Sequence, residues 1–302
     1  THSLLHKAQD IGPKSVRVYT KFVFLVSNHN LYFKMKKLLL LLIALLSTAS
    51  YAQDTTYESA LYIHDVAISE MPRFVKLHKK FTDMSLGENR TMTGEWVFRH
   101  WYGSGHSFVI YSQYNSMEDF HKDADIANQN IRAKINATED AATKETLMKE
   151  WAEYRAFSNG HSDEVRVANK ATGFYQLEET DFDIPFAMVV GKYNSSGSWT
   201  KMGNAFFDWS IKNSVDSGSS MSGGVSYHFM GTSSEVEVWQ CYTNLVEFAK
   251  GVTARAEETE EAKEARKTFW SLVDGAHEDQ IYLHIGHVNM EKGIFDLAGK
   301  DR

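Results

Sequence analysis

Residues 100–122 read HWYGSGHSFVIYSQYNSMEDFHK, and residues 228–250 read HFMGTSSEVEVWQCYTNLVEFAK. Aligned position by position, the two stretches share one His, one Gly, one Tyr, one Phe and one Lys, and Asp119 is matched by Glu247. A repeat of this length indicates one supersecondary unit that is used twice in the same fold.

The residues around each copy predict the same order of elements. Apolar residues with period two indicate strands, and apolar residues three and four apart indicate helices. In the first copy we expect strands at 60–67, 95–102, 107–114 and 164–168, with helices at 71–81, from 117 and at 139–157. In the second copy we expect strands at 186–193, 225–230, 235–242 and 280–285, with helices at 199–209, from 245 and at 260–273.

Each copy is therefore an α+β unit, β-α-β-β-α-β with an extra helix, which is a ferredoxin-like arrangement. One face of such a sheet is covered by helices, so two units can pack bare face to bare face. This layout resembles the dimeric α/β-barrel superfamily, in particular members that carry both repeats in one chain. Similar families are the NIPSNAP, EthD-like and antibiotic-monooxygenase-like proteins and the haem-binding chlorite dismutases. The resemblance implies a single-chain α/β barrel and rests on element order and repetition.

A leader-like segment precedes the repeats. Met35-Lys36-Lys37 opens a leucine-rich run, and Ser50-Tyr51-Ala52 follows. A basic N-terminal region, a short apolar run and a small residue before the cleavage site are typical of a signal peptide. A membrane anchor is the alternative, but it needs about 20 apolar residues. We therefore expect a signal peptide at 35–52, a non-native upstream extension at 1–34, and a mature protein in the bacterial periplasm or secreted.

Composition limits the partners of the mature chain. Residues 1–52 hold seven of the 32 basic residues and one of the 39 acidic ones, which leaves 25 basic and 38 acidic residues, a net charge of −13. Such a surface repels nucleic acid and anionic membranes, so we expect neither as a partner. Cys241 is the sole cysteine, which argues against a disulfide-stapled scaffold. We expect repeats at 57–172 and 186–290, a linker at 173–185 and a tail at 291–302, with self-association left open.

Strand alternation predicts which side chains point between the two sheets. The apolar partners of each strand are assigned to the helices, which leaves a more polar set facing inward. Convergent polar groups on an aromatic wall are typical of small-molecule sites. The candidate ligand-binding residues are Tyr62, His64, Trp96, His100, Tyr111, Gln113, Arg166, Lys192, His228, Glu237, Trp239 and His284. Two alternatives stay open, namely His100 and His228 as an inert pair in the core, and a polar seam filled with buried water.

His161 and His277 each precede a final strand, and each has an aspartate two residues later. They are candidates for a pocket mouth, where an imidazole held by a carboxylate suits acid–base work. A structural role at a helix end is the alternative. No spacing of histidines on one helix predicts a metal site, and we predict no cofactor.

We therefore expect an exported barrel that binds a small, partly apolar molecule between its repeats, with cofactor-free monooxygenase or isomerase chemistry as a candidate activity. One alternative is a haem protein similar to chlorite dismutase, with an inner histidine as ligand. The other is a structural or interaction protein whose barrel is filled.

Overall fold

The computed structural model describes residues 55–103, 105–177, 180–253 and 258–299. The segments expected as an upstream extension and a signal peptide lie outside the described residues. In the described part of the chain, no helix is long and apolar enough to cross a membrane.

The first repeat contains four strands and three helices. It consists of β1 (Thr55–Ile63), α2 (Met71–Ser85), β2 (Met92–Tyr102), β3 (Phe108–Tyr114), α3 (Met117–Asn136), α4 (Ala141–Ala156) and β4 (His161–Asn169).

The second repeat has the same order, and its first helical segment is continuous but contains a π-helical turn. It consists of β6 (Ala187–Ser195), α5 (Trp199–Phe206), η1 (Phe207–Ile211), α6 (Lys212–Asp216), β7 (Ser222–Met230), β8 (Val236–Tyr242), α7 (Leu245–Thr253), α8 (Glu260–Leu272) and β9 (Val273–Asn289). A two-residue strand, β5 (Tyr175–Gln176), lies between the repeats, and β10 (Ile294–Leu297) ends the fold.

Two of the helix starts follow from the capping residues that precede them. Ser116 Oγ accepts a hydrogen bond from Asp119 N at 3.0 Å at the start of α3. Thr259 Oγ1 accepts one from Ala262 N at 3.2 Å at the start of α8. A side-chain oxygen that satisfies a free N–H group of the first turn fixes where a helix begins.

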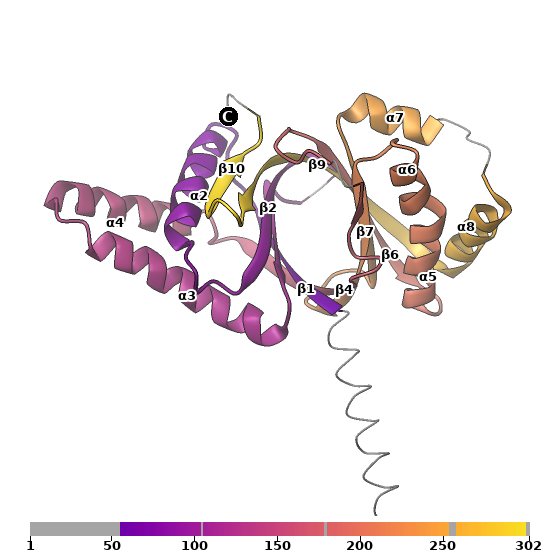
Figure 1. Cartoon of the computed structure of the whole chain (residues 1–302), viewed down its shortest axis with the longest axis horizontal. Helices are drawn as coiled ribbons and strands as arrows, with labels where there is room; N and C mark the ends of the chain where they lie inside the picture. The colour runs from indigo at the N-terminus through magenta and orange to yellow at the C-terminus, as the bar shows by residue number, and fades with distance from the viewer. Residues whose placement is uncertain (1–54, 104, 178–179, 254–257, 300–302) are drawn as a thin grey trace, which may run out of the picture. The chain divides into compact units, whose positions relative to one another are not determined.

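The predicted two-repeat barrel is confirmed, and its strands form one sheet. Within each repeat the strand order is the ferredoxin-like one, β2-β3-β1-β4 and β7-β8-β6-β9. At the junctions, β4 pairs with β7 and β9 pairs with β2. Among the described residues eight strands therefore close into a ring (Figure 1). The helices of the first repeat lie on one side of the ring and those of the second on the other (Figure 1).

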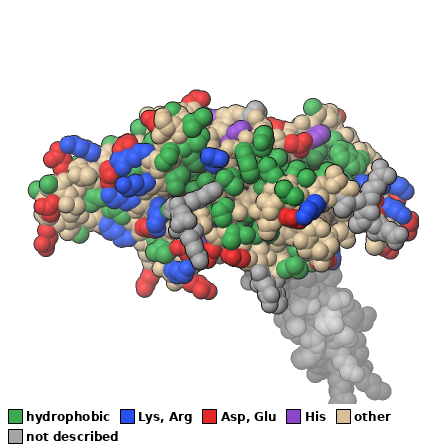
Figure 2. Space-filling view, turned by 90° about the horizontal axis from the view of Figure 1, so that it is seen from above, with side chains coloured by type: hydrophobic (Ala, Val, Ile, Leu, Met, Phe, Trp, Pro, Cys, Tyr) green, Lys and Arg blue, Asp and Glu red, His purple; other side chains and the backbone are tan. Residues whose placement is uncertain are grey.

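Closure of the ring separates the apolar side chains into an inner and two outer groups. Val97, Phe108 and Ile110 pack outward against the helices of the first repeat. Val225, Val236 and Val238 pack outward against those of the second. The inner group contains Phe98, Tyr111, Met188 and Tyr282 among others. Figure 2 shows hydrophobic side chains gathered in the middle of one face, between two ends rich in charged groups.

The C-terminal segment differs from the expected tail. β10 lies within residues 291–302 and pairs antiparallel with β9. Phe295 is fully buried against α2, and its N–H donates to Asp83 Oδ1 at 2.7 Å. The final strand β9 is also longer than the expected 280–285, because its exposed first half pairs with β6 from Ser195 to Gly191. Four residues that lack alternation give no strand signal, which is why the sequence did not predict β10.

Candidate functional site

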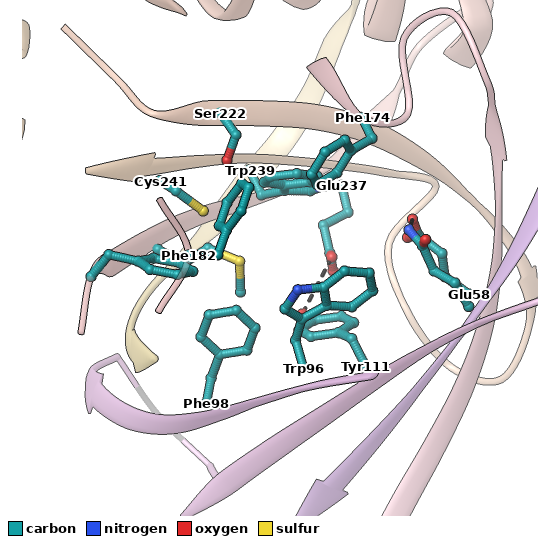
Figure 3. A pocket seen from close by; sticks show the side chains of 13 residues that line it. Glu58, Trp96, Phe98, Tyr111, Phe174, Phe182, Ser222, Glu237, Trp239 and Cys241 are labelled. Carbon is teal, nitrogen blue, oxygen red and sulfur yellow. Dashed lines mark hydrogen bonds between the residues drawn. The ribbon is translucent and has the colours of Figure 1, made fainter. Parts of the chain in front are cut away.

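One end of the barrel holds a pocket that is built by both repeats (Figure 3). It contains about 540 Å³ of unoccupied space including its opening. Its lining residues are Glu58, Trp96, Phe98, Tyr111, Gln113, Phe174, Phe182, Phe186, Met188, Ser222, Glu237, Trp239 and Cys241.

The wall of the pocket is aromatic. Phe174 lies 6.5 Å from Trp96 in a stacked arrangement and 5.6 Å from Trp239, measured between ring centroids. Phe182 lies 6.1 Å from Phe174 and 5.8 Å from Phe186. Trp96 and Trp239 come from strands β2 and β8, whereas Phe174 and Phe182 come from the segment that joins the repeats. The joining segment therefore supplies part of the wall.

Polar groups enter this pocket from strands β1, β3 and β8. Glu58 is 6% exposed, and its Oε1 accepts a hydrogen bond from Gln113 Nε2 at 3.0 Å. Tyr111 OH donates to Glu237 Oε1 at 3.4 Å (Figure 3). Figure 3 shows Glu58 at one side of the rings and Cys241 at the other. Burial raises the pKa of the Cys241 thiol to about 12, so this group is a neutral, poor nucleophile.

A buried charge network continues from Glu237 into the barrel. Lys192 Nζ lies 3.4 Å from Glu237 Oε2 and 3.3 Å from Glu164 Oε1. Lys192 Nζ also donates to Tyr62 OH at 2.7 Å, and Tyr62 OH in turn donates to Glu164. Arg166 lies 3.6 Å from Glu164 Oε2. The network thus sets two cations, Lys192 and Arg166, against two carboxylates, Glu164 and Glu237.

Arg166 is held by β7 and the turn that follows it. Its Nε donates to Ser226 Oγ at 2.8 Å, its Nη2 to Ser226 O at 3.1 Å, and its Nη1 to Ser233 Oγ at 2.9 Å. The guanidinium is fully buried. Because most of its donors are engaged there, it is not a direct counter-ion for Glu58.

The carboxyl groups of the barrel differ in their proton affinity. Burial raises the pKa of Glu58 to about 7, and the charge of Glu237 acts in the same direction, against the hydrogen bond from Gln113. Burial would also raise the pKa of Glu164, but the charges of Lys192 and Arg166 lower it below its ordinary value. Glu164 is therefore a stable anion, whereas Glu58 changes its charge near neutral pH.

Eight of the twelve predicted binding residues fall into two groups along the barrel. Trp96, Tyr111, Gln113, Glu237 and Trp239 line the pocket. Tyr62, Arg166 and Lys192 belong to the charge network behind it. Their role in binding stays a prediction.

The predicted histidines do not line this pocket. His64 lies just beyond β1, where its Nε2 is 2.9 Å from Ser162 Oγ. His100 and His228 occupy equivalent strand positions, paired with Tyr282 and Arg166. Their contacts differ, because the His100 ring lies 5.7 Å from His106 whereas His228 Nε2 donates to Gly231 O at 3.0 Å.

His284 is fully buried inside the barrel and stacks on Phe186, with ring centroids 4.2 Å apart. It also stacks on His287 at 5.6 Å. A straight strand would place these two histidines on opposite faces. The bulge at Ile285, where the register with β2 shifts, turns both to the same side.

His161 and His277 lie at the end of the barrel opposite the pocket, so neither forms its mouth. Each is exposed and sits beside its aspartate, with Nε2–Oδ2 distances of 3.1 Å to Asp163 and 3.0 Å to Asp279. His277 also stacks on Tyr193. The repetition of the pair at equivalent positions fits the structural alternative, a contact that holds the start of β4 and the first half of β9.

Comparisons with known proteins agree with this architecture. No protein-family model matches the sequence, and no curated protein matches it. Among solved structures, a proposed monooxygenase of Fusobacterium nucleatum superposes with a TM-score of 0.50 at 7% identity, over 77% of this chain and 93% of that one. A proposed monooxygenase of Lactobacillus acidophilus gives 0.49 at 9% identity, over 82% and 97%. A proposed chlorite dismutase gives 0.42 at 10% identity, over 76% and 95%.

The chain has a fold like that of the Fusobacterium protein. At these identities the likeness concerns the fold, so the chemistry must be read from the site.

Haem, which chlorite dismutase-like proteins bind, does not fit the pocket described above. Among the described residues that line the pocket there is no histidine, and burial keeps the Cys241 thiol protonated, so neither of these ligand types is offered to an iron. The described residues also contain no group of three His, Cys, Asp or Glu side chains placed to hold a metal ion. We therefore derive no step through haem or a metal.

Sequence reasoning missed several lining residues. Glu58 lies on the same face of β1 as the predicted Tyr62, because the two are four residues apart. The expected strand began at residue 60, and extending it by two residues would have included Glu58. Phe174 and Phe182 lie in the segment expected as a linker, where no periodic pattern assigns a face. Their aromatic character was the available signal.

Proposed function

We propose that this protein binds a small, partly apolar molecule in the pocket between its two repeats. One observation carries the proposal: a void walled by Trp96, Phe174 and Trp239 contains the buried carboxyl groups of Glu58 and Glu237. Apolar walls with few polar groups are typical of small-molecule sites. A barrel filled as a purely structural core has no need of an acid that burial makes costly.

Acid–base chemistry is the reaction that this pocket favours. A general acid or base works best when its pKa lies near the working pH, and burial raises the pKa of Glu58 to about 7. Glu58 can therefore accept a proton from a bound molecule or return one to it. Proton transfer of this kind suits an isomerase or a cofactor-free monooxygenase, the two activities expected from the sequence.

We also propose that the barrel is exported. Lys36-Lys37, the following leucines and Ser50-Tyr51-Ala52 support cleavage before Gln53 and a periplasmic or secreted mature form. N-terminal sequencing of the mature protein tests the cleavage site. Size-exclusion chromatography of the same sample tests self-association.

The binding proposal is tested with 2-naphthol, a neutral, flat and weakly polar probe. At ten times its dissociation constant, a ligand that binds only the folded state stabilises it by about 1.4 kcal/mol. For a domain of this size that raises Tm by about 3–6 °C. We expect such a rise for the wild type, together with saturable heat in isothermal titration calorimetry.

Two tryptophan variants form a matched pair for this experiment. Trp96→Ala removes part of the wall and should weaken binding at least tenfold. Trp270→Ala changes a tryptophan on α8 that is 49% exposed and does not line the pocket, so its affinity should equal that of the wild type. Equal losses of affinity in both variants would refute binding in the pocket, and the absence of a Tm rise would refute binding of a neutral aromatic molecule there.

A further inference from the structure

The charged groups inside the barrel do not balance when Glu58 is ionised. Glu164 and Glu237 face Lys192 and Arg166 within 4 Å, which accounts for two charges of each sign. Glu58 has no such cation among the described residues, and its hydrogen-bond partner is the neutral Gln113. Ionised Glu58 therefore adds one uncompensated negative charge to a buried site, which is costly.

The groups that face Glu58 from neighbouring strands do not correct this imbalance. Gln113 lies opposite it on β3, and Arg166 lies opposite it on β4. Arg166 donates to Ser226, Ser233 and Ser234 and lies beside Glu164. The charge of Arg166 lowers the pKa of Glu58, but the negative charges of Glu237 and Glu164 raise it, and with burial the pKa is raised.

The pocket beside Glu58 has a wall that suits a cation. The faces of Trp and Phe rings carry negative electrostatic potential, and an ammonium group against them is stabilised by roughly 0.5–2 kcal/mol or more. Trp96, Phe174 and Trp239 form such a wall, with the centroid distances given above. Glu237 adds negative charge to the same pocket, because it is 1% exposed and lines the pocket, and its Oε2 has Lys192 Nζ at 3.4 Å but accepts no hydrogen bond from the described residues.

We propose that the ligand of this pocket is an organic cation, an amine or quaternary ammonium compound with an apolar body, whose charge pairs with Glu58. This inference rests on the proposed function and names the chemical class of the bound molecule. The cation would supply the positive charge that the barrel lacks and would lie against the aromatic wall. The acidic chain as a whole, with a net charge of −7, attracts such a ligand.

A pair of isosteric probes separates charge from shape. Choline and 3,3-dimethyl-1-butanol have the same size and differ in the quaternary nitrogen. At pH 8, calorimetry should show choline binding at least tenfold more tightly than the alcohol. Because burial raises the pKa of Glu58 to about 7, choline affinity should fall about tenfold between pH 8 and pH 6, whereas alcohol affinity should change little. Sodium chloride at the same concentration is the control for ionic strength.

Variants of two glutamates complete the test. Glu58→Gln keeps an oxygen that can accept from Gln113 and removes the charge, so the pH dependence of choline binding should disappear and the preference for choline over the alcohol should fall to the part that the aromatic wall supplies. Glu118→Gln changes an exposed residue that pairs with Lys122, and it should leave both unchanged. Circular dichroism establishes that each variant is folded.

The outcomes distinguish the two proposals. If 2-naphthol binds and choline shows no preference over the alcohol, the cation inference is wrong and the pocket remains a binding site. A preference for choline that is undiminished in Glu58→Gln also overturns the inference. If neither 2-naphthol nor choline binds, both proposals are wrong.

Discussion

Replacing Glu58 with glutamine should stabilise the protein at alkaline pH and leave it unchanged near pH 4.5. Burial raises the pKa of this carboxyl group from 4.5 to about 7 in the folded state. The folded state therefore holds the proton more tightly than the unfolded state. As pH rises from 4.5 through 7, the unfolded chain loses this proton first, and the wild type loses stability over that window.

The size of the effect follows from the pKa difference. Each pKa unit corresponds to about 1.36 kcal/mol, so ionising Glu58 in the folded state costs about 3 kcal/mol. For a domain of 150–250 residues, 1 kcal/mol shifts Tm by about 2–4 °C. At pH 8 the Tm of Glu58→Gln should therefore exceed that of the wild type by about 6–12 °C.

The assay is thermal unfolding followed by circular dichroism at half-unit steps from pH 4.5 to pH 8. The difference between the two proteins, rather than either curve alone, is the quantity of interest, because other titrating groups contribute equally to both. A difference that stays constant with pH, or that grows toward acid, would refute the assignment of a buried, unpaired carboxyl group at position 58.

Three further predictions test other parts of the fold. Phe295→Ala should lower the free energy of unfolding by about 3–5 kcal/mol, because the ring is fully buried, whereas the half-exposed neighbour in Ile294→Ala should cost much less; urea unfolding measures both. Ser116→Ala should cost about 1 kcal/mol by removing the cap of α3, and equal stabilities of Ser116→Ala and the wild type would contradict the capping role. Burial lowers the pKa of His106 from 6.5 to about 4, so stability is lost as pH falls from 6.5 toward 4; His106→Gln should lose less Tm than the wild type between pH 7 and pH 4.5.

Most of the architecture could be predicted because each element of one repeat can be compared with its equivalent in the other. A strand that is ambiguous alone becomes clear when its equivalent shows the same alternation, as Val97 and Val225 do on the outer face. Alternation along single strands also placed Tyr111, Glu237 and Trp239 on the inner face, since the side-chain period of a strand is two.

The pocket could be predicted only in part, because its position depends on how the strands are staggered around the ring. Residues on the inner face lie at three positions along the barrel: in the pocket, in the charge network, or at the end opposite the pocket. Alternation along a strand does not distinguish these positions. His64 and Trp96 were therefore assigned to one space although they lie at different positions. The contributions of Phe174 and Phe182 depend on the path of the segment between the repeats, which has no periodicity.

The pairing of β9 with both β2 and β6 has a consequence for how the chain folds. The last long strand, β9, closes the ring by pairing with β6 and with β2. Strand β2 (Met92–Tyr102) lies far earlier in the chain. During synthesis the edges of β2 and β6 stay open until Val273–Asn289 emerges from the ribosome, and open edges invite pairing with other chains. Contacts this distant in sequence also slow folding. Truncations before residue 273 should therefore produce dimers or aggregates, with one chain's edge completing another's, rather than smaller monomers.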